Sequence, residues 1–168
     1  IAACMAENEL AGNVIGVALD GTGYGPDKTV WGGEFLIADL SEYRRVGHFK
    51  QYPMPGGDAA VREPLRMALS YAGSNSGMKA DKLPAFITDR IGKRNAAAML
   101  QAIGKGLNSP LTSSCGRLFD AAAAISGICA NPSYDGQAPQ RFQNICDLKE
   151  ESAYSFEITA PGDENLIL

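Results

Sequence analysis

The sequence predicts a mixed α/β or α+β protein in which strands come first and helices follow. Two apolar runs near the N-terminus, Val14–Asp20 and Thr29–Ala38, flank a glycine-rich loop and have the composition of strands. Helical patterns dominate the rest of the chain. Because strands come first and several helices follow, a mixed α/β or α+β class is expected.

Length and composition place the chain among ordinary globular domains. Its 168 residues suffice for one domain with a real core, and its content of 45% hydrophobic and 20% charged residues argues against disorder. The formal net charge of −4 gives no long-range attraction to nucleic acid or acidic membranes, and no apolar run is long enough to cross a bilayer. We therefore expect no nucleic-acid partner and no membrane partner.

The cysteines favour a cytoplasmic location. None of them forms a C-x-x-C pair, so neither a zinc knuckle nor a thioredoxin-type motif is expected. Buried free thiols in a reducing cytoplasm are the interpretation that we prefer. The four residues are Cys4, Cys115, Cys129 and Cys146.

The first elements can be justified in chain order. The N-terminal residues resemble the end of a helix that Ala11-Gly12 closes. A third, more exposed strand follows the two apolar runs, and a segment with two prolines and two glycines then predicts a loop. The expected elements are a helix end at Ile1–Glu9, strands at Val14–Asp20, Thr29–Ala38 and Tyr43–Phe49, and a loop at Tyr52–Asp58.

The following segments are mainly helical. Pro64 must lie in the first turn of its helix or kink it, because proline lacks an amide hydrogen. The expected elements are a helix at Ala59–Ala72, a variable Ser/Gly/Lys-rich loop at Gly73–Leu83 and a helix at Lys93–Gly104.

A better-defined helix follows Ser113 and Ser114, either of which can cap it, and Gly127 ends it. Its expected apolar stripe consists of Leu118, Phe119, Ala122 and Ile125. A turn at Tyr134-Asp135-Gly136, a helix from Pro139 to about Leu148 and a strand at Ser152–Thr159 complete the expected elements.

The loop after Asp20 carries glycine at alternate positions: Gly21, Gly23 and Gly25. Its G-x-G-x-G spacing lacks the helix that follows a dinucleotide fingerprint, and the terminal Gly-Lys-Ser/Thr of a Walker A loop is absent. The remaining interpretation is a hairpin whose tip, with Asp20 and Thr22, could hold anionic oxygens and a hard cation. The alternative is a plain turn that Asp20 fixes, and the spacing alone favours this alternative.

Gly32-Gly33 interrupts the second apolar run and also has two interpretations. The pair forms either a bulge or a place where a ligand approaches the sheet closely. Trp31 beside it is expected in the core or at its rim. His48, the one histidine of the sequence, has no metal-ligand spacing and is expected to be an ordinary surface or loop residue.

A second candidate site begins at the Ser-Ser cap. Ser114 and Gly116 stand at a helix start, where free amides and the helix dipole attract anions. Asp120 could accept a hydrogen bond from a ribose hydroxyl, or it could pair with Arg117 on the same helix face, and the sequence makes the two about equally plausible. Cys115 has no identifiable base and is rejected as a nucleophile.

Taken together, these stretches resemble the HypF-type carbamoyltransferases of [NiFe]-hydrogenase maturation. The resemblance covers nearly the whole chain, and its motifs are long and specific. A weaker match is the turn Tyr134-Asp-Gly-Gln137. The matching segments are ALDGTGYGPDKTVWGGEFL, GHFKQYPMPGGDAAVREPLRMAL and GLNSPLTSSCGRLFDAAAAISGI.

This resemblance implies an actin-like ATPase (ASKHA) fold and an enzyme of the transferase class. In the family, a neighbouring domain makes carbamoyl-adenylate from carbamoyl phosphate and ATP, and the actin-like domain transfers the carbamoyl group to the C-terminal cysteine of the partner HypE. The product becomes the cyanide ligand of the hydrogenase iron. Residues 1–168 would be the central part of this domain, truncated at both ends.

The resemblance also implies roles for individual residues. Asp20 would be one ligand of a divalent metal, zinc or iron, whose histidine ligands would precede Ile1. The nucleotide or carbamoyl contacts would be Gly21, Thr22, Gly23, Gly25, Gly32, Gly33, Ser114, Gly116, Asp120, Asp135 and Gly136. The sequence departs from the family at Asp135, where glutamate is common, and at Pro139, Gln140 and Arg141, where the family continues with alanine and glutamate.

Two other hypotheses stay open at the level of the sequence. One is a threonylcarbamoyl-transfer enzyme acting on tRNA, from the same fold branch, which the acidic balance and the Pro-Gly-Gly-Asp loop disfavour. The other is a nucleotide-binding module without activity. Because most metal ligands would lie outside it, the isolated chain is expected to be inactive and to bind metal weakly. The thiol nucleophile would come from the partner protein.

Overall fold

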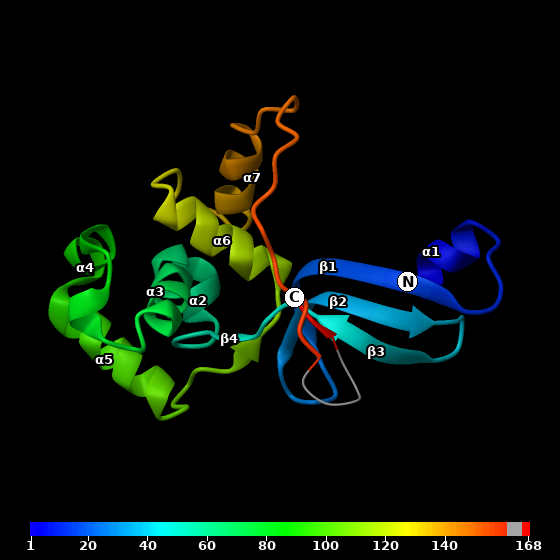
Figure 1. Ribbon diagram of the computed structural model, residues 1–168, viewed down its shortest axis with the longest axis horizontal. Coiled ribbons are helices and arrows are strands. Elements are labelled where there is room, and N and C mark those ends of the chain that lie inside the picture. Colours follow the sequence, from blue (N-terminus) through cyan, green and yellow to red (C-terminus); the bar gives the residue numbers. More distant parts are fainter. Residues whose placement is uncertain (161–165) are drawn as a thin grey trace.

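In the computed structural model, strands and helices occupy opposite ends of the molecule (Figure 1). The structure describes residues 1–160 and 166–168. A sheet and the short helix α1 (Ala2–Glu7) lie at one end, and most of the helices lie at the other. The predicted mixed α/β class is therefore confirmed.

The sheet is built around β2 (Val30–Ala38). This strand pairs in antiparallel fashion with β1 (Val14–Tyr24) and with β3 (Tyr43–His48). At its start, Val30 pairs with Tyr24 of β1 and with Thr112 of β5, so β5 lies on the edge opposite β1. Three short strands complete the sheet: β4 (Tyr52–Pro53), β5 (Leu111–Thr112) and β6 (Leu166–Ile167).

β1 is longer than predicted. The expected glycine loop is largely strand, because β1 continues from Asp20 through Tyr24. Its pairing with β2 shifts register between Leu19 and Gly23, and this irregularity falls on the segment that was expected to be a loop. Glycine tolerates the backbone distortion of such a bulge, which is why the strand can continue through it.

The outer residues of β1 are exposed although they are apolar. Alternate residues of a strand share a face, and Ile15, Val17 and Leu19 are 78%, 53% and 58% exposed. The main core lies instead among the helices. It consists of Leu65, Ala68, Leu69, Leu83, Ile87, Ala96, Leu100, Ile103 and Ala124.

The predicted helix Ala59–Ala72 is in fact two helices. α2 (Ala59–Arg62) ends before Pro64, and α3 (Pro64–Asn75) begins with that proline at its first position. Proline is favoured there because the first helical amide has no partner within the helix. α3 therefore extends into the stretch that was expected to be a loop, and a 3₁₀ turn, η1 (Ala80–Lys82), follows.

Of the next helices, some have the predicted bounds and others do not. α4 (Ala85–Ile91) was missed, whereas α5 (Lys93–Gly104) has the predicted bounds. α6 (Cys115–Ile125) is capped by Ser114, whose hydroxyl accepts a hydrogen bond from the amide of Arg117. α7 (Gln137–Gln143) begins before Pro139 and ends earlier than expected.

The predicted apolar stripe of α6 is wrong. Leu118, Phe119 and Ile125 are 39%, 41% and 46% exposed. The buried face consists instead of small residues and two charged ones: Cys115, Arg117, Asp120, Ala121, Ala123 and Ala124. Alanine allows α6 to pack closely against α3 and α7. The face that permits this close helix packing is buried, although the larger apolar side chains lie on the other face.

Several local expectations need correction. The predicted strand Ser152–Thr159 does not form, and Thr159 makes only an isolated bridge to Ile167. His48 is buried at the end of β3, where its Nδ1 contacts the carbonyl oxygen of Phe49 at 2.8 Å. Within the part of the chain that the structure describes, no helix has the length and apolar character that spanning a membrane requires.

All four cysteines lie in the described ranges and are free, as predicted. Cys115 and Cys129 are buried, but Cys4 and Cys146 are exposed, contrary to expectation. Burial raises the pKa of the Cys115 thiol, which favours the protonated form and agrees with its rejection as a nucleophile.

Candidate nucleotide site

Two adjoining cavities lie between the distorted part of β1, helix α2, helix α6 and the start of α7. The larger has a volume of about 520 Å³, and the smaller about 440 Å³. They share Val61, Asp135 and Gly136 in their walls, so they adjoin one another and are together called the cleft. A cleft of this combined size can hold a nucleotide.

The smaller cavity brings together the two candidate segments of the sequence. Asp20, Gly21 and Thr22 line it from β1, and Gly116 and Arg117 line it from the first turn of α6. The two walls touch, because a Cβ atom added to Gly116 would lie 2.7 Å from the Cα of Gly21. Only glycine permits this approach of a helix start to a strand end.

Ser114 fastens these two walls to each other. Its hydroxyl donates to the carbonyl oxygen of Gly21 at 2.7 Å and lies 3.2 Å from that of Asp20. The same oxygen accepts from the amide of Arg117 at 3.1 Å and so caps α6. Ser114 is 1% exposed, and it therefore shapes the cleft from behind without lining it.

The larger cavity is bounded by Asp120 and by the loop that leads into α7. Asp120 is 3% exposed and forms an ion pair with Arg117, with 2.8 Å between Oδ2 and Nε. The ion-pair interpretation of Asp120 is therefore confirmed. The ribose contact stays a prediction for a residue that also lines the larger cavity. Burial raises the pKa of the Asp120 carboxyl, the positive charge of Arg117 opposes this, and the charge of Asp135 adds to it.

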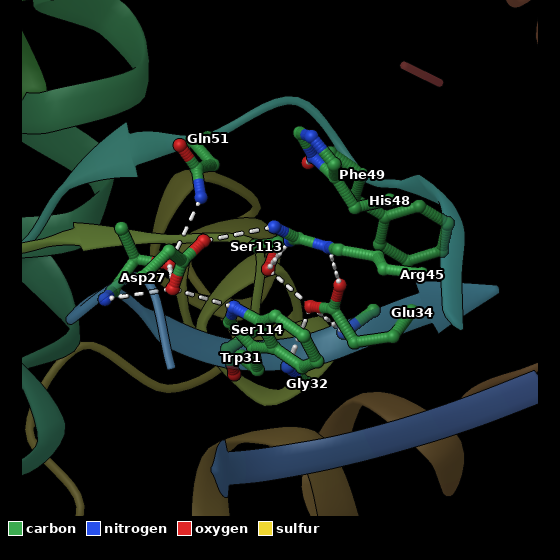
Figure 2. A network of polar contacts seen from close by, with 12 residues as sticks. Asp27, Trp31, Gly32, Glu34, Arg45, His48, Phe49, Gln51, Ser113 and Ser114 are labelled. Atoms are coloured by element: carbon green, nitrogen blue, oxygen red, sulfur yellow. Dashed lines mark hydrogen bonds and ion pairs between the residues drawn. The ribbon is translucent and has the colours of Figure 1, made fainter. Parts of the chain in front are cut away.

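A second network lies behind Gly32-Gly33 and is shown in Figure 2. Glu34 is 2% exposed, and its Oε1 accepts hydrogen bonds from the amides of Gly32 and Gly33 at 3.1 and 3.3 Å. The same oxygen accepts from the hydroxyl of Ser113. Its Oε2 accepts from Nε of Arg45 at 2.6 Å. Glu34 thus ties the middle of β2 to the residue before the cap of α6.

Arg45 extends this network to the hairpin that follows β1. Its Nη1 lies 3.0 Å from Oδ2 of Asp27, and its guanidinium carbon is 4.3 Å from the centre of the Trp31 ring. Asp27 also accepts from the indole of Trp31 at 2.9 Å and from the hydroxyl of Thr29 at 2.8 Å. The hairpin is therefore held by charge as well as by its strand pairing (Figure 2).

The role of Gly32-Gly33 follows from what surrounds the pair. A Cβ atom on Gly32, whose φ is +154°, would lie 2.5 Å from the carbonyl oxygen of Asp20. One on Gly33 would lie 2.4 Å from the carbonyl oxygen of Ser113. The pair therefore packs against the backbone of Asp20 and of Ser113-Ser114, and it is not among the residues that line the cleft.

The structure thus divides the predicted site residues into two groups. Seven of them line the cleft: Asp20, Gly21, Thr22, Gly116, Asp120, Asp135 and Gly136. The other five support its walls or the adjoining hairpin and are not among the lining residues: Gly23, Gly25, Gly32, Gly33 and Ser114. Gly25 packs against the Trp31 indole, where an added Cβ would collide.

Sequence reasoning missed the network residues Glu34, Arg45 and Asp27. A signal for Glu34 was present, because a carboxylate inside an apolar strand requires partners. The partners, Arg45 and Ser113, lie 11 and 79 residues away along the chain, so no local pattern could identify them.

The described residues by themselves do not make a metal centre. No group of three or more histidine, cysteine, aspartate or glutamate residues lies close enough together within residues 1–160 and 166–168 to hold an ion. Asp20 is exposed at the cleft, and its Oδ1 accepts the amide of Gly21 at 2.6 Å. One carboxylate cannot complete the coordination sphere of a structural or catalytic metal.

Comparison with known proteins gives matches over nearly the full chain. A family profile described as "Carbamoyltransferase, Kae1-like Domain, second subdomain" matches residues 16–167. The chain is 45% identical over 152 residues to carbamoyltransferase HypF of Rhodobacter capsulatus and 41% identical over 145 residues to that of Rhizobium leguminosarum bv. viciae. Each alignment covers 86% of this chain but only 19% and 18% of the relative.

A solved structure gives the same result. The crystal structure of a full-length HypF in its phosphate- and nucleotide-bound form is 35% identical and superposes with a TM-score of 0.88. The match covers 99% of this chain and 21% of that protein. The chain therefore spans about a fifth of the length of these relatives.

Proposed function

The chain belongs to the carbamoyltransferase HypF family, and on that premise we propose that it binds a nucleotide in the cleft and serves in carbamoyl transfer. In this proposal, residues 1–168 are the central part of a carbamoyl-transfer domain with an actin-like ATPase fold. The observation that carries it is the gathering of both candidate segments around one cleft of nucleotide size.

The substrates follow from the family and from the chemistry of the cleft. Carbamoyl-adenylate, made from ATP and carbamoyl phosphate, would bind with its ribose near Asp120 and Gly136. Its phosphate would lie near Gly21, Thr22 and Gly116. A relative is described as phosphate- and nucleotide-bound, which supports a nucleotide and a phosphoryl group as ligands.

The transfer itself would proceed by attack of a thiolate on the carbamoyl carbon. A bond forms between sulfur and carbon, the bond from that carbon to the phosphate oxygen of AMP breaks, and AMP leaves with the electron pair. The thiolate would be the C-terminal cysteine of a HypE-type partner, which fits with the burial of Cys115 in this chain. The residues of the cleft would bind and orient the adenylate.

Asp20 keeps its assignment as a metal ligand only as part of this proposal. The remaining ligands would have to come from outside the described residues, so we assign no step of the transfer to a metal. Hydrogenase maturation and a cytoplasmic location belong to the same proposal and rest on the family alone.

The proposal can be tested in the full-length protein that carries this segment. Carbamoyl phosphate, ATP and HypE are mixed, and carbamoylation of the HypE C-terminal peptide is followed by mass spectrometry. We expect Asp20→Ala to lower the rate by at least about tenfold, since Asp20 lines the wall of the cleft. The control Asp89→Ala, an exposed aspartate on α4, should retain the rate.

Unchanged carbamoylation in Asp20→Ala would remove Asp20 from the site. Transfer of a threonylcarbamoyl group to tRNA, with no carbamoylation of HypE, would support the tRNA-directed alternative and contradict the proposed partner.

A further inference from the structure

Arg117 is a buried cation whose hydrogen bonds are incomplete. Its residue is 5% exposed, and neither its Nε nor its Nη1 has a hydrogen-bond partner among the described residues. The ion pair with Asp120 brings Nε to 2.8 Å of Oδ2, but this contact lacks hydrogen-bond geometry. A guanidinium has five N–H groups, and leaving them unmet in the interior is costly.

Arg117, whose Nε and Nη1 lack hydrogen-bond partners among the described residues, is a lining residue of the smaller cavity. Among the residues in the lining of that cavity, Arg117 is the one basic residue, whereas Asp20 and Asp135 are acidic. An anion entering there is therefore repelled by two carboxylates and attracted by one guanidinium. Arg117 also lies in the first turn of α6, where the helix dipole favours negative charge.

We propose that Arg117 binds a phosphoryl oxygen of the nucleotide in the smaller cavity, an inference that rests on the proposed function. Arginine is suited to this role because its planar fork makes two parallel hydrogen bonds to phosphate. The incomplete contact with Asp120 then holds the guanidinium beside the cavity and leaves N–H groups for the ligand. Asp120 is therefore a positioning residue for Arg117, and it also lines the larger cavity, where the ribose is proposed to bind.

The chain offers a matched control for this arginine. Arg66 forms an ion pair of the same three-residue spacing with Glu63, with 2.8 Å between Nε and Oε2, although this pair is hydrogen-bonded and more exposed. Neither residue lines the cleft. Arg66→Met therefore removes a pair of the same spacing without touching the cavity.

The experiment uses hydrogen–deuterium exchange in the full-length protein, read from peptides that cover residues 112–125 and 132–140. These peptides report binding at this cleft alone, even if the protein holds nucleotide elsewhere. ATP and adenosine are titrated separately into the wild type, Arg117→Met, Arg117→Lys and Arg66→Met. Exchange in α5 checks that each variant is folded.

We expect Arg117→Met to weaken ATP binding by about 10- to 100-fold, because hydrogen bonds to charged groups are lost. Adenosine, which lacks phosphate, should bind with unchanged affinity. Arg117→Lys keeps the charge but loses the fork, so its ATP affinity should lie between those of wild type and Arg117→Met. Arg66→Met should match the wild type for both ligands.

Each other outcome has a distinct meaning. Absence of ATP protection in the wild type would overturn the proposed nucleotide site itself. ATP binding that is equal in wild type and Arg117→Met, or an equal loss of ATP and adenosine binding, would overturn the role of Arg117 while leaving the nucleotide site intact.

Discussion

Arg45 and Arg117 both pair with a carboxylate that is almost fully buried, yet their surroundings differ. Around Arg45, the partner Glu34 accepts from two amides and a hydroxyl as well as from the guanidinium. Around Arg117, the pair with Asp120 leaves Nε and Nη1 without a hydrogen bond to any residue that the structure describes, and both residues line the cleft. The adjacent residues Ser113 and Ser114 contact the two pairs, because Ser113 donates to Glu34 and Ser114 accepts from the amide of Arg117.

The difference separates a support from a binding surface. A buried charge stabilises a fold only when its partners are complete, as they are for Glu34. Groups left without partners beside a cavity are a cost that a ligand can remove. The position of Gly32-Gly33 agrees with this division, since the pair belongs to the supporting side and not to the cleft.

The largest expected effect is on the supporting side. Glu34→Ala should lower the free energy of unfolding by about 3–5 kcal/mol, because it leaves Arg45 without its buried partner and orphans the amides of Gly32 and Gly33. Urea unfolding measures this change. Glu34→Gln keeps an acceptor oxygen, so its free energy of unfolding should fall by less. A loss below about 1 kcal/mol for Glu34→Ala would show that the network is not a support.

Replacing each pair by apolar residues sharpens the comparison. Arg117→Met with Asp120→Leu should leave the free energy of unfolding unchanged or raise it by about 1 kcal/mol, because the pair is incompletely satisfied. The matched double variant Arg45→Met with Glu34→Leu should lose about 3 kcal/mol, since the amides of Gly32 and Gly33 lose their acceptor. The reverse order of the two results would contradict the assignment of roles.

The pH dependence of the first double variant provides a further check on the same pair. Burial raises the folded-state pKa of Asp120 above its ordinary value of 3.8, so its ionisation costs stability as the pH rises from 3.8 through the raised pKa. The free energy of unfolding of the double variant, relative to that of the wild type, should therefore be higher at neutral pH than below pH 3.8. Unfolding experiments at both pH values measure it.

The smallest effect is expected at the exposed end of the network. Partial burial alone would raise the pKa of Asp27, but hydrogen bonds from Thr29 and Trp31 and the charge of Arg45 lower it overall. Its stabilisation is then present above the ordinary pKa of 3.8 and is lost as the pH falls below that value.

Asp27→Asn should remove this part of the acid sensitivity. The effect should be only a few tenths of a kcal/mol, because the side chain is 39% exposed. Unfolding free energies at about pH 7 and about pH 3 measure it. An acid sensitivity equal to that of the wild type would remove Asp27 from the network.

How much of the structure the sequence predicts depends on the range of the deciding interactions. The cap at Ser114, the bounds of α5 and the turn at Gly136 were predicted, because each depends on residues within a few positions. The stripe of α6 was predicted wrongly, since large apolar residues are exposed there and alanines are buried. Glu34 was missed as a network residue, because its partners come from β3 and from the start of α6.

By itself, the sequence determined the class of fold, the capped start of α6 that carries one candidate segment, and the resemblance to one family. Those features are local, or they are preserved in long motifs. Only the tertiary structure decided which candidates line the cleft and which support it, because Gly21 and Gly32-Gly33 look alike as sequence but only Gly21 is a lining residue. It also decided that Arg117 lines the cavity and that two of its nitrogens lack hydrogen bonds among the described residues, since both depend on how α6 packs beside β1.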